Sequence, residues 1–189
     1  QQDFLSRHDL PAAYLQTALN WFAPVGQLLL EHQNGAGGPL LVGVNGSQGS
    51  GKSTLCAFLC DWLGAEHAVG AVSLSLDDFY LTRRERQQLA ADVHPLLATR
   101  GVPGTHDMDL LQATLRSLLA GQPTSVPRFD KAVDDRVPND QWETVDGGVG
   151  LVLLEGWCLG VVAQPQAALL LPVNELESRE DPTGGWRQY

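Results

Sequence analysis

The sequence has few cysteines and no long apolar run, and each shortage excludes a class of protein. Its three cysteines, Cys56, Cys60 and Cys158, are spaced neither as a zinc-binding pair nor as a disulfide framework, so we expect reduced thiols in the interior. No apolar run is long enough to span a membrane, and no basic N-terminus leads into a signal-type apolar core. We therefore expect a cytoplasmic protein without a membrane partner.

Positive charge is also scarce. Twelve lysines and arginines stand against 22 aspartates and glutamates, which gives a net charge of −10. A field of this sign repels polyanions, so no nucleic-acid partner is expected, and a small phosphorylated ligand would have to be held by local groups. The length of 189 residues predicts a single domain with helices on both faces of a sheet. Nothing in the sequence predicts an oligomeric state.

One stretch carries the strongest functional signal. Residues Gly46 to Ser53 read G-x-x-x-x-G-K-S, the pattern of a phosphate-binding loop. An apolar strand pattern precedes it at 39–44, and helical spacing follows it at 53–63, which makes a chance glycine-rich turn the weaker interpretation. The expected contacts of a nucleotide are Gly46, Ser47, Gln48, Gly49, Ser50, Gly51, Lys52, Ser53 and Thr54. Lys52 would reach the β- and γ-phosphates, and the Ser53 hydroxyl would bind Mg²⁺.

Acidic residues follow two further strand patterns. Asp77 and Asp78 come after the strand expected at 71–76, and Glu155 comes after the apolar strand expected at 150–154. Ligands in open α/β sheets lie outside the carboxyl ends of the strands, so these carboxylates are expected beside the phosphates. One of them can deprotonate an acceptor hydroxyl or hold Mg²⁺. The alternative for the Asp pair is a cap on the next helix.

Two polar segments are candidates for the acceptor side. The loop before an amphipathic helix at 108–119 carries Arg100, His106 and Asp107; His106 is either a substrate contact or a solvated neighbour of a cap formed by Thr105 or Asp107. Further on, six charges lie within the nine residues 128–136. This density indicates a site for an anionic, hydroxyl-bearing molecule or, alternatively, a solvated surface hairpin.

The remaining sequence predicts connections and packing elements. Only three strands of the main sheet are visible, whereas a complete sheet of this kind normally has about five, so we expect a C-terminal part to be absent. The expected arrangement is a single domain, 1–189, with N-terminal helices in 1–38 and a nucleotide- and acceptor-binding core in 39–189. Further expectations are two helices between 9 and 33 with a break at Pro24, a loop at 34–39, an exposed polar helix at 83–97, an acidic loop at 172–182 and a helix starting at 185.

Four motifs together resemble the family of uridine kinase, phosphoribulokinase and pantothenate kinase: the glycine loop, Ser75–Tyr80, Pro127–Arg136 and Leu154–Trp157. Lys131 and Asp134 stand where uridine kinases have an aromatic residue and a histidine, so the pocket suits a nucleoside poorly. The resemblance is closest to the D-glycerate 3-kinase branch and its bacterial relatives of unassigned substrate. Its marks are S-x-D-D-F-Y-L-T at 75–82, R-G-x-P-G-T-H-D at 100–107, D-K-x-x-x-D-R at 130–136 and E-G-W at 155–157.

The resemblance implies an α/β P-loop fold with a mostly parallel sheet and phosphoryl transfer from MgATP to the hydroxyl group of a small metabolite. Asp77 would be the base, Lys52 would stabilise the γ-phosphoryl group, and Mg²⁺ would lie on Ser53 with Glu155 or Asp78 nearby. If the acceptor is a hydroxy acid such as D-glycerate, Arg100, Arg128, Lys131 or Arg136 would hold its carboxylate. The full set of expected acceptor contacts is Asp78, Tyr80, Arg100, His106, Arg128, Lys131, Asp135 and Arg136.

A nucleotide-dependent switch or accessory NTPase without a metabolite acceptor is the alternative. It is disfavoured because the sequence has no N-K-x-D guanine-reading motif and no Cys/His cluster for delivering metal. A nucleotide-binding module without turnover is disfavoured because Lys52, Ser53, Asp77 and Glu155 are all present.

Overall fold

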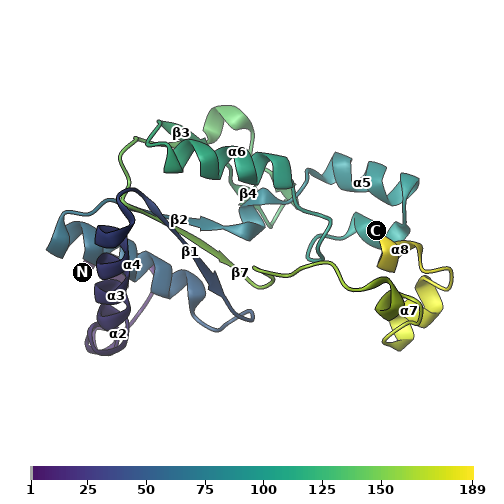
Figure 1. Ribbon diagram of the computed structural model, residues 1–189, viewed down its shortest axis with the longest axis horizontal. Helices are drawn as coiled ribbons and strands as arrows, with labels where there is room; N and C mark the ends of the chain where they lie inside the picture. Colours follow the sequence, from purple (N-terminus) through teal and green to yellow (C-terminus); the bar gives the residue numbers. More distant parts are fainter. Residues whose placement is uncertain (1) are drawn as a thin grey trace.

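A parallel sheet of three strands lies at the centre of the protein, as a computed structural model that describes residues 2–189 shows (Figure 1). Its order is β1 (Leu40–Asn45), β7 (Leu151–Gly156), β2 (Ala71–Ser75). The middle strand, β7, is buried along its whole length, as its unbroken apolar run predicts. The register places Val44 and Ser75 on either side of Glu155, so the carboxyl ends of all three strands meet at one edge.

Helices cover both faces of this sheet, which confirms the predicted α/β layers (Figure 1). Leu151 and Leu153 of β7 pack in one apolar cluster with α4 (Lys52–His67), while Val152 and Leu154 pack in a second cluster with α6 (Met108–Leu119). Successive strand residues point to opposite faces, so β7 contributes to both cores. Burial of such leucines stabilises the fold by roughly 1.5–3 kcal/mol each.

The N-terminal helices are α1 (Gln2–Arg7), α2 (Tyr14–Trp21) and α3 (Ala23–Ala36). The predicted break between two helices is confirmed; Pro24 lies in the first turn of α3, where its missing N–H is not needed. The loop predicted at 34–39 is wrong in its first half. Helix α3 continues through Asn34 and Gly35, and it is Gly37, with φ 68°, that ends it in the left-handed conformation.

The segment after β2 differs from its prediction. A 3₁₀ turn, η1 (Leu76–Phe79), leads to α5 (Arg83–Asp92), which begins with a capping box of Thr82 and Glu85. The helix ends at Asp92 instead of 97, because Pro95 disfavours helix in the residue before it and starts the turn η2 (Pro95–Ala98). The expected exposure of this helix holds for most of its polar residues but not for Arg86, which is completely buried.

A short hairpin forms the charged segment that follows α6. Its strands are β4 (Phe129–Asp130) and β5 (Asp135–Arg136), so the hairpin interpretation of residues 128–136 is correct in outline. A second antiparallel pair, β3 (Thr124–Val126) and β6 (Glu143–Val145), was not predicted, because three-residue strands are too short to show a period. The turn η3 (Asn139–Gln141) lies between the two pairs.

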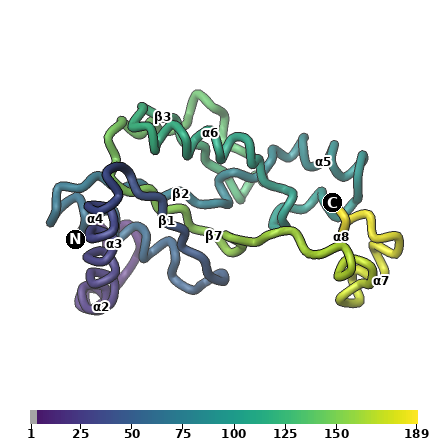
Figure 2. Tube along the Cα trace, viewed as in Figure 1, coloured from purple at the N-terminus to yellow at the C-terminus, as the bar shows by residue number. Residues whose placement is uncertain are grey.

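Beyond β7 the chain leaves the sheet and ends beside the α5 region (Figure 2). It forms η4 (Gln166–Leu169), α7 (Glu175–Glu180) and α8 (Gly185–Gln188). The loop predicted at 172–182 is therefore wrong over α7, whose N-terminus is capped by Asn174, while the helix expected from 185 is confirmed. His94 Nε2 lies 3.0 Å from the Glu180 carbonyl oxygen and joins this part to the end of α5.

None of the helices between residues 2 and 189 has both the length and the apolarity to cross a membrane. The three cysteines are unpaired thiols, as predicted, but only Cys56 is buried, whereas Cys60 and Cys158 are half-buried. Burial raises the pKa of Cys56 to about 11 and that of Cys60 to about 12, so both thiols stay protonated at neutral pH.

Candidate active site

The glycine-rich stretch Gly46–Ser53, the phosphate loop, joins β1 to α4. Gly49 and Gly51 have φ of 74° and 87°, which side chains other than glycine rarely adopt. At Gly46 an added Cβ would lie 2.9 Å from Ser50 Oγ, so a side chain there would require the Ser50 hydroxyl to move. Lys52 begins α4, and its Nζ donates to the Ser47 carbonyl oxygen at 3.1 Å, which folds the side chain back over the loop.

A serine hydroxyl and a buried carboxylate meet at the N-terminus of α4. Ser53 Oγ donates to Glu155 Oε1 at 2.9 Å, and Glu155 Oε2 lies 3.8 Å from Lys52 Nζ. Glu155 is the last residue but one of the central strand, where it is only 8% exposed. The position at the strand end therefore brings the acid to the phosphate loop, as the sequence predicted from the two motifs separately.

Oxygen ligands suit this position for Mg²⁺. Ser53 and Glu155 supply a hydroxyl and a carboxylate, and proteins usually hold Mg²⁺ with one or two such groups plus water and substrate phosphates. Across residues 2–189 no group of three or more His, Cys, Asp or Glu side chains is arranged to hold a metal ion. A Mg²⁺ ion that is held partly by substrate phosphates and water does not need such a cluster, so Ser53 and Glu155 fit the ion.

Asp77 faces the phosphate loop from the end of β2. Its Oδ2 accepts a hydrogen bond from Lys131 Nζ at 2.6 Å, and Lys131 comes from the hairpin. The Lys131 side chain is 58% exposed, whereas that of Asp77 is 23% exposed. The ion pair therefore spans the opening between the sheet edge and the hairpin.

These groups surround one cavity of about 170 Å³. Four of the nine predicted nucleotide contacts line it, namely Gln48, Gly49, Lys52 and Ser53; the other five complete the loop and the first turn of α4. The remaining lining residues are Ser75, Asp77, Lys131, Glu155, Gly156 and Trp157. Ser75 and Trp157 were not predicted as site residues, although each lies within a quoted motif, two residues from an acid.

Asp78 points away from this cavity. Its carboxylate accepts from the Phe129 amide at 3.0 Å and from Arg128 Nη1 at 3.1 Å, both on the hairpin. Burial raises the pKa of Asp78, although these two donors oppose the shift. Asp78 thus binds the hairpin to the end of β2 and caps no helix, since the cap of α5 is Thr82.

Tyr80 and His106 form a stacked pair behind Asp77. Their ring centres lie 4.3 Å apart, with 23° between the planes, and their backbones form an isolated antiparallel bridge. Burial, with the Asp77 carboxylate close by, raises the pKa of Tyr80. His106 is 7% exposed, and its Nε2 is buried without a hydrogen-bond partner. His106 is therefore a buried residue that does not line the 170 Å³ cavity, and it is no solvated neighbour of the α6 cap, which is formed by Asp107.

The other predicted acceptor contacts are occupied by partners within the chain. Arg136 donates to the Tyr80 carbonyl oxygen at 2.8 Å and to Asp107 at 3.0 Å, and Asp135 accepts from the Arg83 amide at 2.9 Å. Arg100 forms an ion pair with Asp134. Arg128 reaches Glu143 at 3.3 Å in addition to Asp78. None of these four lines the 170 Å³ cavity.

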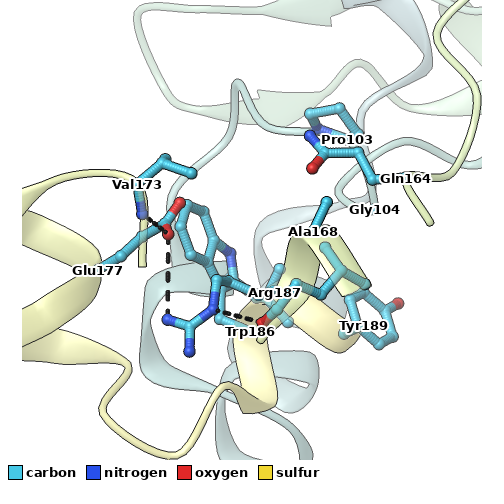
Figure 3. A pocket seen from close by; sticks show the side chains of 11 residues that line it. Pro103, Gly104, Gln164, Ala168, Val173, Glu177, Trp186, Arg187 and Tyr189 are labelled. Carbon is cyan, nitrogen blue, oxygen red and sulfur yellow. Dashed lines mark hydrogen bonds and ion pairs between the residues drawn. The ribbon is translucent and has the colours of Figure 1, made fainter. Parts of the chain in front are cut away.

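A second cavity of about 330 Å³ lies between the C-terminal elements and the segment 97–104 (Figure 3). Its charged groups hold one another or the backbone. Arg187 donates to the Leu169 carbonyl oxygen at 3.1 Å and pairs with Asp181 at 3.2 Å, while Glu177 accepts from the Val173 amide at 2.9 Å. It shares no lining residue with the cavity at the phosphate loop.

Comparison with known proteins agrees with this geometry. The sequence model of the Phosphoribulokinase / Uridine kinase family matches residues 41–173. An uncharacterized kinase, mug58, of Schizosaccharomyces pombe is 36% identical over 152 residues, which are 76% of this chain and 54% of that protein. A chloroplastic D-glycerate 3-kinase of Arabidopsis thaliana is 35% identical over 137 residues, 67% of this chain and 30% of that protein.

A solved structure of another D-glycerate 3-kinase is also similar to this chain. D-glycerate 3-kinase from Cryptococcus neoformans superposes with a TM-score of 0.66 at 31% identity, over 84% of this chain and 57% of that one. The chain thus spans between 30% and 57% of the length of these three relatives.

Proposed function

Because the chain belongs to the phosphoribulokinase/uridine kinase family, we propose that it transfers the γ-phosphoryl group of MgATP to a hydroxyl group of a small metabolite. The observation that carries this proposal is the shared cavity. Lys52 and Ser53 of the phosphate loop, Glu155 of the central strand and Asp77 of η1, which follows the neighbouring strand β2, line the same 170 Å³ space. This grouping supports the proposal, because groups that can bind a phosphoryl donor and a carboxylate that can act as a base lie beside the same cavity.

On the nucleotide side, the loop amides and Lys52 bind the β- and γ-phosphates and stabilise the charge that develops during transfer. Mg²⁺ held by Ser53 and Glu155 would neutralise further charge on the phosphate oxygens when it is bound. Positioning and electrostatics supply most of the catalysis in this class of reaction.

On the acceptor side, Asp77 accepts the hydroxyl proton. Its Oδ2 is paired with Lys131 at 2.6 Å, so an acceptor whose hydroxyl binds at Oδ2 takes the place of the ammonium group. An acceptor that carries its own negative charge offers Lys131 a new partner at the same moment. This exchange favours an anionic acceptor over a neutral one.

The acceptor class that fits is a small hydroxy acid, for which D-glycerate is the model because two relatives carry that name. Among the four cations considered for its carboxylate, Lys131 alone lines the cavity. The guanidinium groups of Arg100, Arg128 and Arg136 already pair with Asp134, Asp78 and Asp107.

The test is ADP release from MgATP by the full-length protein, with hydroxy acids, sugars and vitamin alcohols as acceptors. We expect release that depends on an acceptor and is fastest with a hydroxy acid. Release without any acceptor would instead identify a nucleotide switch, and no release would identify an inert binding module. Preference for a neutral sugar would keep the kinase and overturn the hydroxy-acid assignment.

Replacement of the cation tests the role of Lys131 directly. Loss of one charge-assisted contact costs about 1.5–3 kcal/mol, so Lys131→Met should raise KM for the hydroxy acid about tenfold or more and leave KM for ATP nearly unchanged. Arg179→Gln, which removes a 69% exposed charge on α7, is the control and should change neither constant. A larger effect on KM for ATP would place Lys131 on the nucleotide instead.

A further inference from the structure

Arg86 is an unusual residue of α5, because its side chain is fully buried in the side of the protein that carries the hairpin. Its guanidinium donates to the Leu81 carbonyl oxygen at 2.7 Å, to the Ala98 carbonyl oxygen at 3.3 Å, and to the carbonyl and carboxylate oxygens of Asp134 at 3.0 and 2.7 Å. One side chain thus joins the segments on either side of α5 to the hairpin, which is 48 positions away in the sequence. A buried charge is tolerated only when it is paired in this way.

Asp134 occupies the turn of the hairpin with φ 58°, a left-handed conformation that aspartate and asparagine adopt more readily than most residues. Its carboxylate lies between Arg86 and Arg100. Both guanidinium groups also lie over the ring of Phe129, at 5.5 and 5.6 Å from its centre. The hairpin is therefore held at its turn by charge and along β4 by an aromatic ring.

The same hairpin carries the groups that reach the end of β2. Lys131, three residues before Asp134, pairs with Asp77, while the Phe129 amide donates to Asp78. Neither Arg86 nor Asp134 lines the 170 Å³ cavity. Any effect of these two residues on the acceptor would have to pass through the placement of the hairpin.

We propose that Arg86 and Asp134 are positioning residues, which fix the hairpin so that Lys131 stands opposite Asp77 and the acceptor is bound in one orientation. The proposal rests on the proposed function in so far as the hairpin forms the acceptor side. The chemistry of the pair supports it. Burial opposes ionisation of Asp134, but the hydrogen bond from Arg100 and the charges of both arginines hold the pKa of its carboxyl below the usual range.

Two mild variants separate positioning from folding. Asp134→Asn keeps the shape and the left-handed turn but removes the charge that both arginines share. Arg86→Lys keeps the positive charge, yet one ammonium group cannot reproduce a planar fork that bonds to three segments. Arg84→Lys is the matched control, since Arg84 lies two residues away on the same helix and is exposed.

The first measurement is hydrogen exchange of residues 128–137 in the full-length protein without any acceptor. We expect the amide of Val137, which donates to the Arg128 carbonyl oxygen at 2.8 Å, to exchange at least tenfold faster in Asp134→Asn and Arg86→Lys. The sheet amides of β7 should be unchanged, as should all amides in Arg84→Lys. Unchanged exchange at Val137 in both variants would overturn the proposal.

The second measurement compares the KM for the acceptor with the KM for ATP. KM for the acceptor should rise about tenfold or more in both variants, with KM for ATP within about twofold of the wild-type value. The double variant should cost no more than the worse single one, because both replacements break one connection. Additive losses, or equal losses for ATP and acceptor, would contradict positioning. If the wild-type protein turns over no acceptor, the proposed function fails, and hydrogen exchange still decides whether the pair fixes the hairpin.

Discussion

His106 is the clearest example of a residue whose chemistry depends on the surroundings. Its imidazole is 7% exposed and stacked on Tyr80, and its Nε2 has no hydrogen-bond partner. Burial lowers the pKa of His106, although the charge of Asp77 opposes the shift. The folded protein therefore holds a neutral imidazole at a pH where the unfolded chain already binds a proton.

This difference predicts a loss of stability with acid. The unfolded chain binds more protons below about pH 6.5, so the free energy of unfolding should fall as the pH drops through that value, by at most about 1.4 kcal/mol per pH unit for one group. His106→Phe keeps the stacking and removes the proton site. In urea unfolding between pH 5 and 8, the wild-type protein should lose more stability than His106→Phe. Parallel curves would show that His106 is charged in the folded state.

At the residue level, the sequence predicted those functional residues that belong to short local motifs. The phosphate loop and the acids at the strand ends come from short motifs, and Ser53 meets Glu155 because both motifs have fixed places in a parallel sheet. The pairing of Arg86 with Asp134 spans 48 positions and has no local signature, since a buried arginine looks like any other charge on a polar helix. The ion pairs of Arg100, Arg128 and Arg136 likewise have no local signature in the sequence.

At the scale of the elements, Asp107 both caps α6 and pairs with the hairpin. Asp107 Oδ1 accepts from the Leu110 amide at 2.9 Å, and Oδ2 pairs with Arg136 at 3.0 Å. We expect Asp107→Ala to lower the free energy of unfolding by about 1–2 kcal/mol, because it removes both contacts. Asp107→Asn retains a capping oxygen and should lose less. Urea unfolding measures both, and an Ala variant as stable as the Asn variant would show that the cap contributes nothing.

The bounds of helices and strands were predicted best where apolar residues repeat at a regular spacing. Helix α6 was predicted at its observed bounds, 108–119, because its apolar positions repeat over three turns. By contrast, α7 has six residues, and its acidic composition resembles a loop; the Asn174 cap alone marked its start. Strands β3 and β6 depend on pairing with each other and could not be found from three residues each.

At the scale of the whole molecule, two sides meet at the carboxyl edge of the sheet. The phosphate loop and α4 lie on one side, and the hairpin with α5 and the C-terminal helices lies on the other (Figure 1). Only Lys131 of the hairpin lines the cavity between them. With a net charge of −10, the protein attracts an anionic ligand only through such local cations.

The most direct test of this account is the Asp77→Asn variant of the full-length protein, with turnover and MgATP affinity measured side by side. Removal of a general base should lower kcat about 10²–10⁴-fold, while the dissociation constant of MgATP should change less than about threefold, because the phosphate loop is untouched. Undiminished turnover, or a loss of MgATP affinity as large as the loss of turnover, would contradict the claim that Asp77 faces the bound phosphates as the base.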